Sequence, residues 1–304
     1  MKVVVFGCQQ IAVDILKYLE KRNDIELPLV ITYELPLDET YGYKSVIQYC
    51  KNKKIDYMYP KSVNNKVNQK ISDISPDLIL SIYYRKILPK QLINLPHLGC
   101  INIHPSKLPN YRGPVPTAWA IENGETEFGI TIHCMDETID TGDILVQETY
   151  EIEEDETGYE LYTRAMELGS NLFKKSFDKI INKKILPMPQ NGIGSYYGKK
   201  LGRFIIDWQI PLEEIRNKIR VHAKPFNPAE TILFNRYVLI NKAKPYTKAM
   251  EPLQGPGVIK KVLSNGQFIV SCVDGYLLIK DYEIVPKLSN KEKKIYLKKG
   301  NRFG

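Results

Sequence analysis

The sequence lacks several patterns that would each place it in a familiar class. Its five cysteines include no pair with C-x-x-C spacing, and their number is odd. We therefore predict neither a disulfide framework nor a metal site. No apolar run is long enough to span a bilayer, and the chain opens without the charged region and cleavage site of a signal peptide. These absences predict a cytoplasmic protein without a membrane partner.

Two phosphate-binding patterns are missing as well. The first apolar segment, residues 2–7, ends in the single glycine Gly7. A dinucleotide fold needs G-x-G-x-x-G at this place for its tight turn and for the close approach of the pyrophosphate. The P-loop pattern G-x-x-x-x-G-K-[ST] does not occur either. A nicotinamide or flavin oxidoreductase is therefore disfavoured, and ATP-driven chemistry has no support.

The order of the apolar segments predicts a Rossmann-like α/β domain, with a mostly parallel sheet covered by helices on both faces. Continuous apolar runs, typical of buried parallel strands, alternate with segments of helical spacing. Strands are predicted at 2–7, 27–32, 55–60, 76–84 and 98–104, and helices at 11–21 and 43–54. Strands at 129–137 and 143–152 are joined by a short turn and indicate a hairpin. Thr157 and Glu160 form a capping box that opens a long helix.

A second domain is predicted in the last third of the chain. Residues 185–203 are rich in proline and glycine and lose the hydrophobic periodicity, which marks a boundary. We expect a catalytic domain over 1–185, a linker over 186–204 and a C-terminal domain over 205–304. After a helix at 211–221, this last domain shows short strands separated by turns, the pattern of a small β-barrel.

The net charge of +8 is concentrated near the end of the sequence. Residues 287–302 hold seven lysines or arginines against one glutamate. A basic tail is one feature of proteins that bind nucleic acid. A solvated, partly frayed terminus explains the same composition, and this is the interpretation that we favour.

One polar group interrupts the apolar strands. Asn102 and His104 lie two residues apart, so they share a face of their strand. Asp140 follows further along the chain, in the turn sequence IDTGD. An asparagine can donate to an oxyanion, a histidine can exchange a proton near neutral pH, and a carboxylate can orient the histidine. Without a serine or cysteine nucleophile, this set fits direct acyl transfer to a substrate amine. Packing of the strand and a plain turn at Asp140 explain the spacing equally well. We expect His133 to be structural and His97 to be solvated.

Three longer motifs carry a resemblance to a known family: NIHPSKLPNYRG, GITIHCMDETIDTGDIL, and IDW followed by IRVHAKPFNPAE. They resemble the 10-formyltetrahydrofolate-dependent formyltransferases, over roughly residues 1–285. Within this family, SIYYRKILPKQL (81–92) is similar to the formyltransferase domain of the enzyme that acts on UDP-4-amino-4-deoxyarabinose. The resemblance implies that the C-terminal domain is OB-like, that 10-formyltetrahydrofolate is the cosubstrate, and that the protein is a homodimer.

The resemblance also implies roles for the residues that match these motifs. Asn102 would polarise the formyl oxygen, His104 would be the general acid–base, and Asp140 would raise the pKa of the histidine. Two loops would contact the folate, largely through their backbone: Lys86, Ile87 and Leu88 in the first, and Asp136, Glu137, Thr138 and Ile139 in the second. Residues 105–113, which follow the strand of Asn102 and His104, are here called the motif loop. Three of its residues would lie near the acceptor: Lys107, Tyr111 and Arg112.

The implied function is a sugar-nucleotide N-formyltransferase that acts on a UDP- or dTDP-linked amino sugar for surface glycans such as lipopolysaccharide. Two departures leave the acceptor open: Lys107 replaces a common leucine, and Pro114 replaces an arginine of the aminoarabinose enzyme. The alternative is methionyl-tRNA formyltransferase, which the basic tail would suit. Against it, residues 33–45 are short and acidic where that branch has a long basic loop, so we do not expect a nucleic acid partner. A third possibility is a module that binds folate or nucleotide without turnover, against which the intact Asn102, His104 and Asp140 argue.

Overall fold

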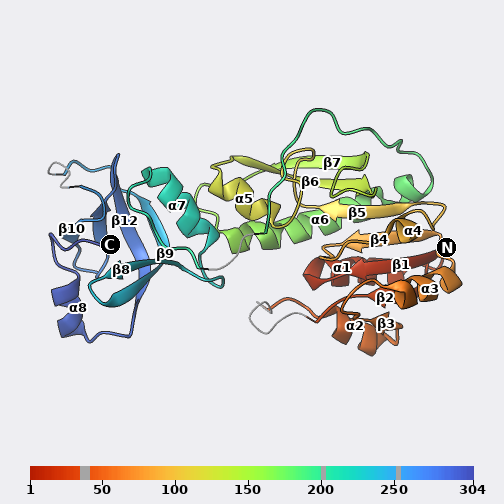
Figure 1. Cartoon of the computed structure of the whole chain (residues 1–304), viewed down its shortest axis with the longest axis horizontal. Helices are drawn as coiled ribbons and strands as arrows, with labels where there is room; N and C mark the ends of the chain where they lie inside the picture. The colour runs from red at the N-terminus through yellow and green to blue at the C-terminus, as the bar shows by residue number, and fades with distance from the viewer. Residues whose placement is uncertain (35–41, 200–202, 251–254) are drawn as a thin grey trace. The chain divides into compact units, whose positions relative to one another are not determined.

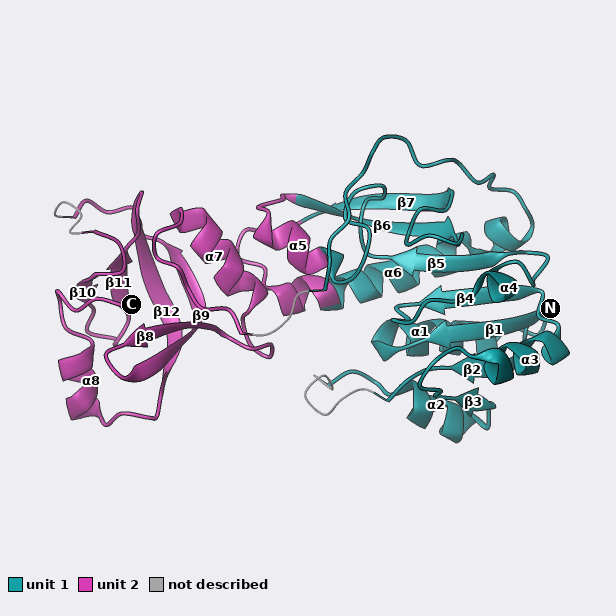
Figure 2. Ribbon diagram, in the orientation of Figure 1, with its two compact units in different colours: residues 1–116, 127–151, 163–199 teal, residues 117–126, 152–162, 200–304 magenta. Residues whose placement is uncertain are grey.

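The structure is a computed structural model that describes residues 1–34, 42–199, 203–250 and 255–304 (Figure 1). It divides into two compact units, each of which combines segments that are distant in the sequence (Figure 2). Unit 1 comprises residues 1–116, 127–151 and 163–199. Unit 2 comprises residues 117–126, 152–162 and 200–304. Most of the acidic 33–45 segment lies outside the described residues.

A seven-stranded mixed sheet forms the centre of unit 1, in the order β3-β2-β1-β4-β5-β6-β7. Its strands are β1 (Lys2–Gly7), β2 (Glu26–Ile31), β3 (Tyr57–Met58), β4 (Leu78–Ile82), β5 (Cys100–His104), β6 (Glu127–Cys134) and β7 (Ile144–Glu151). The first five strands run parallel, and β6 and β7 pair antiparallel. The predicted parallel sheet with an antiparallel hairpin is therefore confirmed.

The helices that alternate with these strands are capped by side chains at several of their starts. They are α1 (Gln9–Glu20), α2 (Val46–Lys53), α3 (Asn65–Ile74), α4 (Lys90–Ile93), α5 (Pro116–Glu122) and α6 (Gly158–Ile181). The side chains of Ser45 and Asn64 each accept a hydrogen bond from the N–H three residues further on. Thr157 and Glu160 form the predicted capping box ahead of the long helix α6.

Apolar packing covers both faces of the sheet. On one face, the absence of a side chain at Gly169 lets α6 lie close to Ile103 of β5, Ile130 of β6 and Ile11 of α1. On the other face, α3 and α4 pack against strand residues. The cluster there contains Val4, Phe6, Leu29, Ile31, Val67, Ile71, Ile79, Leu88, Leu92, Ile93 and Cys100. The sheet is thus the middle layer of three, as the buried, continuous apolar strands predict.

Three local features differ from the prediction. The expected strand at 55–60 is reduced to the two residues of β3. The expected strand at 76–84 ends at Ile82, because Tyr83 has a φ of 54° and the left-handed region breaks an extended chain. Helices α3, α4 and α5 were not predicted from the sequence; α4 and α5, with four and seven residues, are too short for a helical period to stand out.

Unit 2 is built on a five-stranded antiparallel sheet in the order β10-β11-β12-β9-β8. Its strands are β8 (Ala229–Leu233), β9 (Arg236–Pro245), β10 (Ile259–Val262), β11 (Phe268–Ser271) and β12 (Tyr276–Val285). Its helices include α7 (Leu212–Val221) and α8 (Asn290–Tyr296). The buried Trp208 donates from Nε1 to Thr231 Oγ1 at 2.9 Å, which ties the IDW motif to β8.

The basic segment near the end of the sequence is ordered. Most of its lysines are exposed, as expected, but the expectation of a frayed terminus is wrong. Ser289 and Glu292 form a capping box at the start of α8. Phe303 is 3% exposed and stacks on Trp208, with ring centroids 5.5 Å apart. The many lysines of the segment predict that it is solvated. Phe303, which follows them, is instead buried in the core and fixes the end of the segment there.

We expect Phe303→Ala to lower the free energy of unfolding of unit 2 by about 3 kcal/mol, because it leaves a cavity beside Trp208 in a closely packed core. Urea denaturation followed by tryptophan fluorescence measures this loss. Phe234→Ala is the matched control: Phe234 is 64% exposed, so its removal should cost about 1 kcal/mol or less. Equal stability of the two variants would show that Phe303 does not belong to the core.

Candidate active site

Asn102 and His104 lie on one face of β5, as the two-residue period predicts. Both belong to the face that α3 and α4 cover, because they share it with Cys100 of that cluster. They stand at the carboxyl end of a parallel strand, where open α/β sheets bind their ligands. The antiparallel register of β5 and β6 sets Asn102 opposite His133 and His104 opposite Thr131.

His104 is 5% exposed and faces an acceptor at each ring nitrogen. Its Nε2 lies 2.9 Å from the carbonyl oxygen of Tyr111. Its Nδ1 lies 3.5 Å from Oδ2 of Asp140. A carbonyl and a carboxylate can only accept, and a neutral imidazole has one N–H to give. The protonated ring satisfies both neighbours at once, so the surroundings stabilise the form of His104 that has taken up a proton.

Burial works against that charge. It lowers the pKa of His104 below the ordinary imidazole value, and nearby His133 lowers it further. The Asp140 carboxylate and the Tyr111 carbonyl raise the pKa but do not offset the burial. His104 is therefore neutral near pH 7, yet it can take a proton with two acceptors already in place, which suits a general base.

His133 belongs to this cluster. It is 1% exposed, and its Nε2 lies 3.1 Å from Asn102 Nδ2. An amide nitrogen only donates, so Nε2 accepts and the ring proton is on Nδ1, which donates to the carbonyl of Cys134 at 2.7 Å. His133 thus has the structural role that was expected, but it has this role inside the site, where its ring orients the Asn102 amide. His133 lies within the second motif, but its spacing there gives it no role, and only the pairing of β5 with β6 places it beside Asn102.

Asp140 joins the strand residues to the motif loop. Its Oδ1 accepts from Asn102 Nδ2 at 3.3 Å, and its Oδ2 accepts from the N–H of Gly113 at 2.9 Å. Burial alone would raise the pKa of this carboxyl. The adjacent His104 and His133 and the N–H of Gly113 outweigh burial and hold the pKa of Asp140 well below its usual range. Asp140 is therefore ionised in any solution near neutrality.

These contacts depend on unusual backbone geometry in the motif loop and in the turn that contains Asp140 and Gly142. Tyr111 has a φ of 59° and Asp140 a φ of 55°, in the left-handed region that non-glycine residues rarely adopt. Gly113 has a φ of +92°, and a Cβ there would lie 2.4 Å from the carbonyl oxygen of Tyr197. At Gly142 a Cβ would lie 1.9 Å from the carbonyl oxygen of Cys134. Both glycines are thus required by close approach of the backbone.

The three residues expected near the acceptor are dispersed. Lys107 is exposed and forms a loose ion pair with Glu127 at 3.9 Å. The ring of Tyr111 stacks on Tyr197 at 5.0 Å, while its carbonyl binds His104. The Arg112 guanidinium donates to the amide oxygen of Gln190, at 2.7 Å from Nη2 and 3.2 Å from Nε. Of the three, only Tyr111 contacts the cluster itself, and it does so through its backbone.

The first of the two loops expected to hold folate has a mixed character. Leu88 is 2% exposed and belongs to the core of unit 1, whereas Ile87 is 75% exposed. The Lys86 amine donates to the carbonyl of Pro60. The side chains of Lys86 and Leu88 are therefore engaged with the protein, which leaves the backbone of this loop and the Ile87 side chain for a ligand.

The second loop, residues 135–140, is held by internal hydrogen bonds. The Asp136 carboxylate accepts from the N–H of Thr138 at 2.9 Å and from the hydroxyl of Thr141 at 2.8 Å. Glu137 forms an ion pair with Lys90 of α4 at 2.5 Å. Ile139 is 44% exposed. The Asp136 carboxylate thus fixes the backbone of this loop, and an apolar side chain is exposed on it, as Ile87 is on the first loop.

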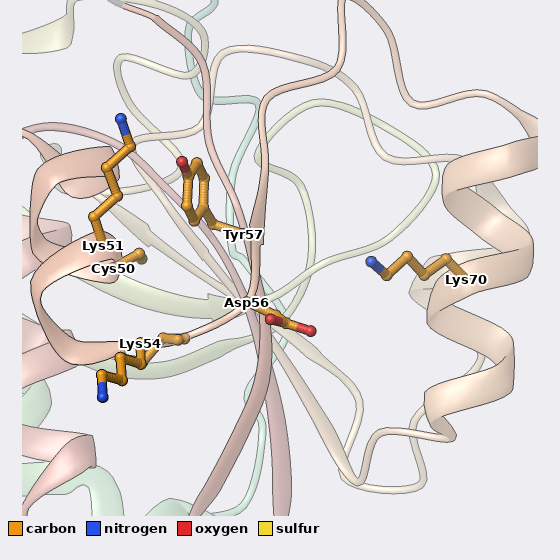
Figure 3. A pocket seen from close by; sticks show the side chains of 7 residues that line it. Cys50, Lys51, Lys54, Asp56, Tyr57 and Lys70 are labelled. Atoms are coloured by element: carbon orange, nitrogen blue, oxygen red, sulfur yellow. The ribbon is translucent and has the colours of Figure 1, made fainter.

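A cavity of about 510 Å³ lies elsewhere in unit 1. It is lined by residues of α2, β3, α3 and their connections: Cys50, Lys51, Lys54, Ile55, Asp56, Tyr57 and Lys70. Figure 3 shows Lys70 reaching across from α3 toward the side on which Lys51 and Tyr57 stand. None of its lining residues belongs to β5, β6 or the motif loop, so the cavity is not part of the cluster around His104.

Two further kinds of feature are absent from the described residues. No group of three or more histidine, cysteine, aspartate or glutamate side chains there is arranged to hold a metal ion. Nor does any described helix combine the length and the apolar character that crossing a membrane requires.

Comparisons with known proteins identify the family. Residues 1–177 match the formyl transferase domain, and residues 200–291 match the C-terminal domain of formyl transferases. The chain belongs to the formyl transferase family. This formyltransferase is 36% identical over 221 residues to the methionyl-tRNA formyltransferase of Pelobacter propionicus, covering 72% of this chain and 67% of that protein. It is 34% identical over 275 residues to the bifunctional polymyxin resistance protein ArnA of Wigglesworthia glossinidia brevipalpis, covering 90% of this chain and 41% of that protein.

Solved structures show the same fold. The N-formyltransferase from Helicobacter canadensis, in complex with folinic acid and dTDP-3-aminofucose, superimposes with a TM-score of 0.73 at 24% identity, covering 93% of this formyltransferase and 99% of that chain. The predictions of the family, of the fold class and of formyltransferase chemistry are thus confirmed. The roles of the individual residues stay predictions.

Proposed function

We propose that this formyltransferase moves the formyl group of 10-formyltetrahydrofolate to the amine of an amino sugar linked to UDP or dTDP. The proposal is carried by the cluster of Asn102, His104 and Asp140. In the described part of the chain, the polar partners of these side chains include no serine or cysteine side chain. The nucleophile must then come from the second substrate, and a primary amine is the nucleophile that a buried, neutral histidine can assist.

Each residue has one task in this reaction. Asn102 shares one N–H with His133 and the other, at 3.3 Å, with Asp140. The second, weaker bond is the one that Asn102 exchanges for a bond to the formyl oxygen, where negative charge develops as the amine attacks. The new bond joins the amine nitrogen to the formyl carbon. His104 accepts the proton that the amine loses, with Asp140 and the Tyr111 carbonyl as its partners.

The tetrahedral intermediate then breaks the bond between the formyl carbon and the folate nitrogen. The protonated His104 supplies a proton to this nitrogen, so tetrahydrofolate leaves as a neutral amine and the imidazole returns to its starting state. Asp140 stays ionised throughout, because its pKa is held well below its usual range. No oxidant, metal or second nucleophile is required, and the atoms and charges balance over the cycle.

The two loops at 86–88 and 136–139 are proposed to hold the folate. Each has one exposed isoleucine, Ile87 or Ile139, beside a side chain that hydrogen-bonds within the protein, Lys86 in the first loop and Asp136 in the second. A pterin ring has amide-like edges for backbone groups and flat faces for apolar side chains, which is the combination these loops offer. Lys107, Tyr111 and Arg112 are proposed to face the acceptor side of the motif loop.

The amino-sugar acceptor rests on two observations. Residues 81–92 resemble the aminoarabinose branch, and the similarity to the ArnA protein extends over 90% of this chain. In addition, residues 33–45 contain Glu34, Asp38 and Glu39 against one lysine, which would repel a phosphate backbone. UDP or dTDP is proposed as the nucleotide, and the Helicobacter canadensis enzyme, bound to a dTDP sugar, shares the fold.

A second candidate is methionyl-tRNA formyltransferase. It is favoured by the 36% identity to the Pelobacter propionicus enzyme, which exceeds the identity to ArnA. The exposed lysines of α8 and the residues after it would suit an RNA backbone. The two candidates share every catalytic step and differ only in the acceptor.

The experiment that separates them is an acceptor panel. Tetrahydrofolate release is measured with 10-formyltetrahydrofolate and, in turn, UDP- and dTDP-linked 3-amino and 4-amino sugars and charged initiator tRNA. We expect turnover with one class of amino sugar and none with the tRNA. Turnover with the tRNA alone would overturn the proposed acceptor and favour the second candidate. Each product is confirmed by its gain in mass of one formyl group.

Four expectations stay predictions beside this proposal. The protein is proposed to act as a homodimer in the cytoplasm and to supply N-formylated sugars to surface glycans. A division into a catalytic domain over 1–185, a linker over 186–204 and an OB-like domain over 205–304 is also proposed. In the structure, residues 186–199 lie within unit 1, where they pair with the motif loop and with β7.

A further inference from the structure

Residues 186–199, here called the strap, bind along the motif loop of unit 1. The N–H of Arg112 donates to the carbonyl of Ser195 at 2.9 Å, and the N–H of Tyr197 donates to the carbonyl of Arg112 at 3.0 Å. The N–H of Tyr111 donates to Ser195 Oγ at 2.9 Å. At the other end of the strap, Met188 and Ile144 of β7 exchange two backbone hydrogen bonds. The strap therefore spans from the start of β7 to the loop that carries Tyr111.

Gln190 stands at the centre of the strap and uses its whole amide. Its Nε2 donates to the carbonyl oxygens of Asp140, at 2.9 Å, and of Gly142, at 2.8 Å. Its Oε1 accepts two hydrogen bonds from the Arg112 guanidinium. Carbonyls only accept and a guanidinium only donates, so a single orientation of the amide fits. Glutamate has no protons to donate here, and lysine has no acceptor.

We infer that Gln190 is a positioning residue, which fixes Asp140 and the motif loop at the distance from His104 that the proposed reaction needs. The inference rests on the proposed roles of His104 and Asp140. Gln190 holds the backbone of Asp140 on one side, and Gly113 holds its carboxylate on the other. Gly113 directly follows Arg112, which is the second partner of Gln190. The Gln190 amide therefore connects the motif loop to the Asp140 turn, and these two segments meet at the Asp140 carboxylate.

The coupling has a direct chemical consequence. Asp140 has a left-handed φ of 55°, which costs conformational energy and persists only where neighbours enforce it. Removing Gln190 takes away the hydrogen bonds that its amide gives to the carbonyls of Asp140 and Gly142 and that help to hold the turn in this shape. The carboxylate then moves from His104, and a displacement of about 1 Å in a catalytic group can cost about 100-fold in rate.

The test combines kinetics with an NMR titration. Gln190→Met removes all four hydrogen bonds at similar volume, and Gln190→Glu keeps an acceptor for Arg112 while losing both donors. Gln209→Met is the matched control, because Gln209 is exposed in unit 2. We expect both Gln190 variants to lower kcat about 10- to 100-fold, with little change in the KM for folate, and the control to match the wild type.

The titration follows the imidazole signals of the four histidines without any substrate, with His104 assigned from a His104→Asn spectrum. The groups that face His104 are Asp140, His133 and the Tyr111 carbonyl. In Gln190→Met the carboxylate is further away, so the pKa of His104 should fall below its wild-type value. Since Gln190→Met is uncharged, no new charge obscures this shift.

The outcomes are distinct. A lower melting temperature with wild-type kcat and an unchanged titration of His104 would mean a merely structural strap and would overturn the inference. Wild-type kcat in both Gln190 variants would overturn it too. If no amino sugar is an acceptor, the proposed function fails, but kcat with the acceptor that is used, together with the substrate-free titration, still decides the role of Gln190. If Gln190→Met does not fold, kcat and the pH profile of Gln190→Glu decide it.

Discussion

Replacing His104 by asparagine is expected to lower kcat by about 1000-fold, because a positioned general acid–base contributes about 100- to 10,000-fold. Asparagine can still donate to the Tyr111 carbonyl, so the motif loop should keep its place. In the proposed mechanism, the variant loses the group that takes up the proton of the attacking amine. The measurement is steady-state release of tetrahydrofolate, with whichever acceptor the wild-type enzyme uses.

The pH profile shows whether the loss is that of a base. The proposed mechanism needs the neutral imidazole, so kcat/KM of the wild type should fall as the pH drops through the pKa of His104. Burial places this pKa below the ordinary imidazole value, and the acid limb should lie there. His104→Asn should lack the limb altogether. The matched control is His97→Asn, because His97 is exposed and pairs only loosely with Asp77, at 3.4 Å. Undiminished turnover in His104→Asn would contradict the assignment.

Asp140→Asn is expected to lower kcat about 100-fold, because it removes the charge that stabilises the protonated His104 and disturbs the orientation of Asn102. An asparagine can still accept from the N–H of Gly113, so the turn should survive. The sign of the pH effect is fixed. The Asp140 carboxylate raises the pKa of His104, so its neutralisation lowers that pKa and moves the acid limb to lower pH. The activity measured across the acid range tests both effects.

Asp143→Asn provides the control on the same turn. Asp143 lies three residues after Asp140 and acts on Cys134. Burial raises the pKa of the Cys134 thiol, and the negative charge of Asp143 raises it further. It makes no recorded contact with His104, His133 or Asn102 in the described part of the chain. Its neutralisation should leave the rate and the acid limb unchanged. A limb that stays in place in Asp140→Asn would mean that this carboxylate does not act on His104.

The part of the site that sequence reasoning predicts is the part that local geometry determines. Asn102 and His104 share a face because a strand alternates with a period of two, and this holds wherever the strand is placed. The short turn between β6 and β7 likewise predicts a hairpin from local residues. The buried, apolar character of β1, β4 and β5 was enough to predict parallel strands inside a layered fold.

His133 and Gln190 could not be found in this way, because their places depend on contacts across the fold. His133 enters the site through the register of β5 on β6, which no local period determines. Gln190 reaches Arg112 over 78 positions of sequence and lies in a stretch where proline and glycine remove all periodicity. The composition of that stretch indicates a boundary, and its hydrogen bonds make it a structural part of unit 1.

The strap gives the enzyme a weak point that its core does not share. Every residue from 182 to 199 is at least partly exposed, and Leu186, Met188 and Ile193 are more than half exposed. The strap therefore gains little from the hydrophobic effect and is held by hydrogen bonds that water can replace. Segments of this kind open at a smaller free energy than the whole molecule needs to unfold. We therefore expect low denaturant concentrations or mild heating to release the strap while the sheet persists. If Gln190 positions Asp140 as proposed, activity is then lost before the fold.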